Sequence, residues 1–83
     1  MKVQVRYFAS VREALSSSGE AVDTQAETLA ALRDELIARG GAYATALARG
    51  KAVRMALDQT MSDEAAALRE SCEVAFFPPV TGG

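Results

Sequence analysis

The stretch KVQVRYF, residues 2–8, alternates between two kinds of side chain. Val3, Val5 and Tyr7 fall on one side of an extended chain, and Phe8 falls on the other side among polar and charged residues. A period of two with β-branched and aromatic residues predicts a strand with one buried face. The chain is therefore expected to begin with a half-buried strand, against which the later elements can be placed.

Three further segments are expected to be strands. Residues 21–24 predict a short return strand after the turn sequence SSSG at 16–19, so that the first two strands form a hairpin. Residues 51–58 alternate again, with every second side chain apolar. Residues 73–77 predict a last strand, which stops at the prolines 78–79 because proline cannot donate a hydrogen bond to a ladder.

Residues 28–39 predict the main helix. Its apolar side chains share one stripe at helical spacing and are Leu29, Leu32, Leu36 and Ile37. Thr28 is expected to be the N-cap residue, and Gly40 suits the C′ position. Glu35 and Arg39 have the i,i+4 spacing of an ion pair on the helix surface.

Two other segments have weaker helical features. Tyr43 and Leu47 can share one face of a short helical turn that ends at Gly50. The run AAAL at 65–68 gives the segment 62–69 helical propensity.

The predicted order is strand, strand, helix, strand, strand. This order favours an α+β domain with a mixed sheet and one main helix packed on one face. The two terminal strands can lie side by side in the centre, which is the β-grasp arrangement of ubiquitin. With 83 residues the chain has room for a single domain, residues 1–83, in which 78–83 form an extended, flexible C-terminal tail.

The composition excludes several classes of function. The formal net charge is -2 and no basic cluster stands out, so neither nucleic acid nor a membrane surface is an expected partner. The chain has no His, which rules out a Ser-His-Asp triad, and no pattern of ligands for a metal. Its single cysteine, Cys72, cannot form an internal disulfide, and the start of the chain does not have the pattern of a signal peptide. We therefore expect a cytoplasmic protein without a bound metal.

The tail PPVTGG, residues 78–83, has the chemistry of a terminus that enters a narrow site. Its two prolines favour an extended course, and six residues beyond the last strand reach at most roughly 20 Å. Gly82 and Gly83 have no side chains, so they can pass through a narrow cleft and bring the terminal carboxylate to a buried catalytic centre. The alternative from the residues alone is an ordinary frayed chain end.

Three stretches carry a resemblance to a known family. The run EVAFFPPVTGG, residues 73–83, resembles the C-terminal signature of the small subunits of molybdopterin synthase, the sulfur carriers of molybdenum cofactor synthesis. VRYFASVRE, residues 5–13, resembles the family's first strand and the loop that follows, and DQT at 58–60 is similar to a polar turn of the family. The chain departs from the family at Ser71 and Cys72, where Gly-Asp is common, and in the helical features of the segment after the third strand.

The resemblance implies a specific use of the tail. A carboxylate with a pKa of about 3.5 is a poor electrophile at neutral pH, so an activating enzyme first adenylates Gly83 with ATP. Sulfur from a donor system then displaces AMP and leaves a thiocarboxylate on Gly83. The loaded tail enters the large synthase subunit, where the sulfur passes to a pyranopterin precursor and forms the dithiolene. The residues implied in the tail are Pro78, Pro79, Val80, Thr81, Gly82 and Gly83.

The resemblance also implies what the chain does not supply. It is expected to be the sulfur-donating subunit of a heterotetramer with the large subunit, without catalytic machinery of its own. No cofactor is expected to stay bound, since the activating enzyme consumes the ATP.

Strand alternation predicts a docking patch beside the tail. If Val74 and Phe76 fill the core, Phe77 faces outward next to Phe8, and Met61 can complete the apolar cluster. An exposed apolar cluster of this kind indicates an interface. The resemblance implies that residues matching Phe8, Met61 and Phe77 contact the partners, whereas the alternative is that some of them lie at the edge of the core.

Other functions compete with the synthase carrier. A thiamine-type sulfur carrier or a ubiquitin-like modifier shares the fold and the Gly-Gly end, and a plain binding module with an inert tail is a third class. Cys72 suggests a persulfide carrier, but the sequence predicts no helix N-terminus or basic cluster beside it that would activate the thiol, so a packing role is favoured.

Overall fold

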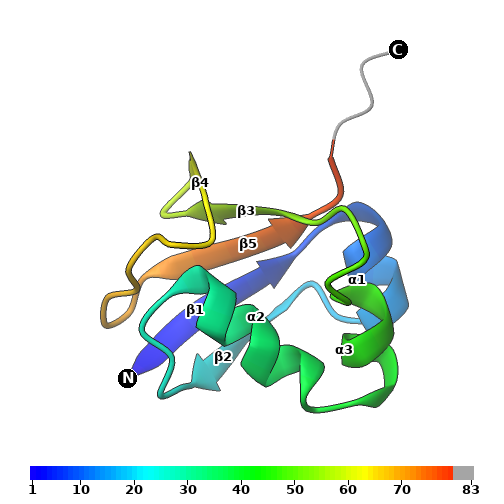
Figure 1. Cartoon of the computed structure of the whole chain (residues 1–83), viewed down its shortest axis with the longest axis horizontal. Coiled ribbons are helices and arrows are strands. Elements are labelled where there is room, and N and C mark those ends of the chain that lie inside the picture. Colours follow the sequence, from blue (N-terminus) through cyan, green and yellow to red (C-terminus); the bar gives the residue numbers. More distant parts are fainter. Residues whose placement is uncertain (80–83) are drawn as a thin grey trace.

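The computed structural model describes residues 1–79, which form a five-stranded sheet and three helices. In chain order the elements are β1 (Lys2–Tyr7), α1 (Ala9–Leu15), β2 (Gly19–Asp23), α2 (Leu29–Ile37), α3 (Gly41–Ala46), β3 (Arg54–Leu57), β4 (Thr60–Ser62) and β5 (Glu73–Phe77). In Figure 1, α2 lies across the sheet, and α1 and α3 lie beside each other close to the end at which β5 finishes.

The sheet has the order β2-β1-β5-β3-β4. β1 and β5 are parallel, with Val5 opposite Val74, and the other neighbouring pairs are antiparallel. The predictions of a mixed sheet, of an N-terminal hairpin and of terminal strands paired in the centre are therefore confirmed. The architecture is the ubiquitin-like β-grasp fold, in which an α+β chain folds its sheet around one main helix.

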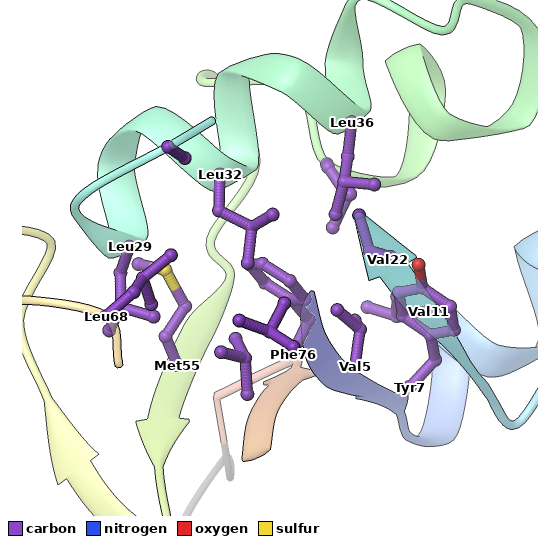
Figure 2. Packing of buried hydrophobic residues seen from close by; sticks show 14 of the residues in the cluster. Val5, Tyr7, Val11, Val22, Leu29, Leu32, Leu36, Met55, Leu68 and Phe76 are labelled. Carbon is purple, nitrogen blue, oxygen red and sulfur yellow. The ribbon is translucent and has the colours of Figure 1, made fainter. Parts of the chain in front are cut away.

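The core lies between α2 and the adjacent face of the sheet. Its most deeply buried side chains are Val3, Val5, Tyr7, Leu29, Leu32, Leu36, Leu47, Val74 and Phe76. Figure 2 shows Leu32 of α2 pointing toward Phe76 of β5, and the ring of Phe76 stacks on that of Tyr7 with a centroid distance of 6.4 Å. The alternation predicted for residues 2–8 is confirmed, because Val3, Val5 and Tyr7 are buried while the residues between them are exposed.

The main helix follows the prediction at its start and differs at its end. Thr28 is the N-cap residue, and its side chain accepts a hydrogen bond from the backbone N–H of Ala31 at 3.2 Å. The helix ends at Ile37, earlier than expected. Gly40, with φ of 76°, precedes α3 as its N-cap residue instead of closing α2 at C′. This conformation favours glycine because a Cβ there is strained.

The short helix α1 was not predicted. It has seven residues, and only Val11 among them is fully buried. Seven residues make only about two helical turns, which is too few for apolar side chains to repeat along one face, so the sequence shows no helical period here. The helix ends where Ser16 adopts a left-handed conformation with φ of 53°.

The helix suggested for 62–69 is wrong. The segment begins with the end of β4 and continues through turns. Its carbonyl groups accept hydrogen bonds from the first turn of α2, because the N–H of Leu29 donates to Ala66 and that of Ala30 donates to Glu64. Leu68 in turn donates to Glu27 and inserts its side chain into the core. The segment thus satisfies the free N–H groups of another helix, and this tertiary role overrides its alanine content.

The ion pair predicted between Glu35 and Arg39 is also wrong. The guanidinium of Arg39 pairs with Glu20 at 2.9 Å, and the carboxylate of Glu35 accepts a hydrogen bond from Thr24 at 2.8 Å. Both partners are remote in sequence, so helical spacing alone gave no sign of them.

Glu20 joins three parts of the fold. Besides Arg39, its carboxylate accepts hydrogen bonds from the hydroxyl groups of Tyr7 at 2.8 Å and Tyr43 at 2.6 Å. It thereby connects β1 and β2 to the junction of α2 and α3. Burial alone raises the pKa of Glu20, but the hydrogen bonds from Tyr43, Arg39 and Tyr7 outweigh it and lower the pKa below its usual value.

We predict that Glu20→Gln lowers the free energy of unfolding at neutral pH by about 1–3 kcal/mol, because charge-assisted hydrogen bonds are weakened. Urea unfolding measures the loss, with Glu13→Gln on the exposed part of α1 as the matched control. Since the folded pKa of Glu20 is depressed, its contribution is present above the unfolded pKa of about 4.3 and is lost as the pH falls through the folded pKa. Wild type and variant should therefore converge in acid, and a difference that stays constant with pH contradicts the assignment.

Candidate functional site

The base of the tail is fixed in the centre of the sheet. β5 is paired on both sides, with Tyr7 of β1 opposite Phe76 and Arg54 of β3 opposite Phe77. The N–H of Phe8 donates to the carbonyl of Phe76 at 3.1 Å, which extends the pairing of the two strands almost to the end of β5. In Figure 1 the chain leaves the sheet at this end of β5.

Of the six predicted tail residues, the structure describes only the first two, Pro78 and Pro79. Pro78 and Pro79 are partly buried where the chain leaves β5. The predictions for Val80, Thr81, Gly82 and Gly83, including an extended and flexible tail, lie outside the described residues.

The three predicted docking residues come together on the face of the sheet opposite the core. Phe8, Met61 and Phe77 line one shallow hollow of about 390 Å³. Phe8 is 43% exposed and Met61 is 60% exposed, while Phe77 is partly buried. Together with Ala56 and Ala75 they form what we call the docking patch.

The floor of the docking patch is made of small residues. Ala56 of β3 and Ala75 of β5 are opposite each other in the sheet, and Met61 of β4 is opposite Ala56. The alanines are only 8% and 7% exposed, so the larger side chains of Phe77 and Phe8 form the sides of a recess. Sequence reasoning missed this floor, because only the strand register reveals that two small residues are neighbours.

A tight turn holds Met61 in place. Asp58 and Gln59 both have positive φ, 49° and 68°, as in the two-residue turns that suit a β-hairpin. The carboxylate of Asp58 accepts hydrogen bonds from the N–H of Glu73 at 2.9 Å and from Arg69 at 2.7 Å. The hydrogen bond from Glu73 is the main cause that lowers the pKa of Asp58. The polar turn at 58–60 therefore ties the β3–β4 hairpin to the start of β5.

Cys72 lies in the hydrophobic core and is 4% exposed. A buried thiol packs as a small apolar side chain and is shielded from a sulfur donor. The structure therefore favours the packing role over the persulfide hypothesis.

The neighbouring carboxylates of Asp63 and Glu64 have structural partners. Glu64 forms ion pairs with Arg33 and Arg49, while Asp63 accepts a hydrogen bond from the backbone of Ala65. Within residues 1–79 no group of three His, Cys, Asp or Glu side chains is arranged to hold a metal ion. The helices of this described part are too short and too polar to cross a membrane.

Comparison with known proteins agrees with this geometry. The model of the ThiS family matches residues 5–83. Two molybdopterin synthase sulfur carrier subunits, from Escherichia coli and Haemophilus influenzae, are 40% and 36% identical to the chain, and each match covers 98% of the chain and 99% of the relative.

A solved structure shows the same fold. It is a chain of a protein–protein complex of subunits 1 and 2 of molybdopterin-converting factor from Helicobacter pylori 26695, with a TM-score of 0.70, 24% identity and full coverage of both chains. The curated relatives confirm the resemblance seen in the tail and in the first strand. The chain belongs to the ThiS family, alongside the sulfur carrier subunits of molybdopterin synthase that it matches from end to end.

Proposed function

We propose that the chain is the sulfur carrier subunit of a molybdopterin synthase. The observation that carries this proposal is the match over nearly the full length to two subunits of that name, at 36% and 40% identity. The geometry supports it, because an apolar docking patch lies at the end of the strand that leads into the Gly-Gly tail. The chain thus combines a partner-binding surface with a terminus suited to carry a small group.

The proposed chemistry takes place on the carboxylate of Gly83. An activating enzyme transfers AMP from ATP to this carboxylate and releases pyrophosphate, which turns one carboxylate oxygen into part of a leaving group. A donor of sulfide-level sulfur, such as hydrosulfide, then attacks the carbonyl carbon, AMP departs as the leaving group, the S–H proton is released, and a thiocarboxylate remains. The large synthase subunit uses this sulfur to build the dithiolene of molybdopterin. The chain supplies the reactive terminus, and its partners supply the active sites.

The partners are expected to share the docking patch. Gly83 is the sixth residue after Phe77, and six residues span at most roughly 20 Å. Any partner that accepts Gly83 in an active site must therefore approach Phe77 closely. We infer that the large subunit and the activating enzyme bind the same surface in turn, and that two carriers and two large subunits form the heterotetramer.

The final acceptor distinguishes this function from its alternatives. A thiamine-type carrier or a protein modifier uses the same activation of a terminal glycine but delivers the group elsewhere. Transfer of sulfur to a pyranopterin precursor by the reconstituted synthase therefore separates the three. A cytoplasmic location remains a prediction, in line with the single free thiol.

The central prediction concerns the length of the tail. Deleting Gly83, or adding one glycine after it, should abolish sulfur delivery, because either change moves the reactive carbon by about 3.5 Å in a preorganised site. Intact mass spectrometry after incubation with ATP, the activating enzyme and a sulfur donor should show one oxygen-to-sulfur exchange on the C-terminal fragment of wild type. One glycine added before Met1 is the control, and it should load normally.

Two results would refute this assignment. One is a mass gain that maps to a fragment other than the C-terminal one. The other is a folded Gly83 deletion variant that still delivers sulfur to the pterin.

Truncating the docking patch should weaken both complexes. Phe77→Ala removes a central aromatic side chain, and we expect it to cost about 2 kcal/mol or more in binding, or roughly 30-fold in Kd. Calorimetric titration with each partner measures the change. Ile37→Ala is the matched control, because this partly buried side chain packs against the core from α2, away from the patch. Equal affinities for wild type and a folded Phe77→Ala protein would exclude the patch.

Cys72 should be dispensable for sulfur carriage. We expect Cys72→Ser to load sulfur and support dithiolene formation at near-normal rates below its melting temperature, since the sulfur resides on Gly83. The buried hydroxyl should nevertheless lower the melting temperature, because it needs a hydrogen-bond partner in the core. Loss of loading in the folded variant, detected by the same mass shift, would restore the persulfide hypothesis.

A further inference from the structure

Two arginines flank the docking patch. Arg6 of β1 lies two positions before Phe8, which directly follows the strand and is still extended, so both side chains lie on the same face of the sheet, with the Arg6 guanidinium 5.8 Å from the centre of the Phe8 ring. Arg54 is opposite Phe77 in the sheet and is exposed. The recess is therefore bordered by a cation on its β1 side and another on its β3 side.

Most other arginines have structural partners. Arg33, Arg39, Arg49 and Arg69 each form an ion pair with a carboxylate on a neighbouring element, and Arg33 is buried. Arg54, in contrast, forms no ion pair and no side-chain hydrogen bond within residues 1–79. Among the arginines of this part of the chain, the same is true only of Arg12 in α1. Within residues 1–79, the guanidinium of Arg54 is therefore not needed to hold two elements of the fold together.

Arg6 is nearly as available for external contacts. Among residues 1–79 its one ion pair is long, 4.0 Å to Glu73, and its side chain is 54% exposed. Exposed pairs at this distance contribute little to stability. Of the described residues that line the hollow, Glu73 alone is acidic, and it is partly buried, with 29% of its side chain exposed.

The charge near the docking patch differs from that of the whole chain. The formal net charge is -2, yet Arg6 and Glu73 line the hollow of the docking patch and Arg54 lies beside it, opposite Phe77. Arg54 also lines a neighbouring hollow with Asp63 and Glu64, of which Glu64 is already paired with Arg33 and Arg49. An acidic partner surface is attracted to such a border, while a basic one is repelled.

We propose that Arg6 and Arg54 form a cationic rim that pairs with carboxylates on the large synthase subunit, placed around an apolar projection that fills the docking patch. This inference rests on the proposed function and adds the chemistry of the partner surface. The apolar recess supplies affinity, and the rim supplies the rate of association and the choice of partner.

The rim predicts a salt-dependent association with the large subunit. Arg54→Gln should slow association by about 3–10-fold at about 0.02 M salt, and the difference should shrink at about 0.5 M salt, where charges are screened within a few ångströms. Arg54→Glu, which has nearly the same size as the Gln variant, should be slower still because it repels the carboxylates. Arg6→Gln should act in the same direction.

Stopped-flow fluorescence with the intact large subunit measures these rates. Gln25→Glu is the matched control, since it changes the net charge by the same amount as Arg54→Gln but lies beside α2, away from the docking patch. It should associate like wild type. Equal rates for Arg54→Gln and Arg54→Glu, or effects that persist unchanged at high salt, would overturn the rim.

The same experiment separates this inference from the proposed function. Loading of wild-type Gly83 by the activating enzyme is a separate measurement, made with the rim intact and without the large subunit, so it tests the carrier function and not the pairing of the rim with that subunit. Failure of loading refutes the carrier function, whereas normal loading combined with salt-independent association refutes the rim alone.

Discussion

The parallel pairing of β1 with β5 is the constraint on which the rest of the structure depends. Val5 opposite Val74 and Tyr7 opposite Phe76 join the two ends of the chain in the middle of the sheet. Everything between them has to fold as hairpins and helices on either side of this pair. The same pairing brings Phe8, which follows β1, to the end of β5, so one set of backbone hydrogen bonds both completes the core and assembles the docking patch.

The sequence predicts the parts of the fold that have a clear period. Alternation in residues 2–8 identified the buried face of β1, and the leucines of α2 identified the main helix. It did not predict α1, which is too short to show a stripe, or the course of 62–69, whose carbonyl groups cap α2. The contacts of Glu20 were likewise hidden, because three donors from distant segments meet there only after folding.

The large apolar residues of the candidate site were predicted from the sequence, but its alanines and arginines were not. Alternation together with family resemblance identified Phe8, Met61 and Phe77, which the structure places around one recess. The alanine floor depends on the register between β3 and β5, and the position of Arg54 depends on the same register. The alternation within each strand does not give the register between β3 and β5, so these features could not be predicted from the sequence.

The central position of β5 also has a mechanical consequence. A partner that draws the tail into its active site pulls along the axis of β5, which is held by ladders on both sides. Such a force loads those hydrogen bonds in shear, so many must break together, whereas a force across an edge strand would peel them apart one at a time. The sheet can thus resist a force applied through the C-terminus, and the domain can bind and be released repeatedly without unfolding.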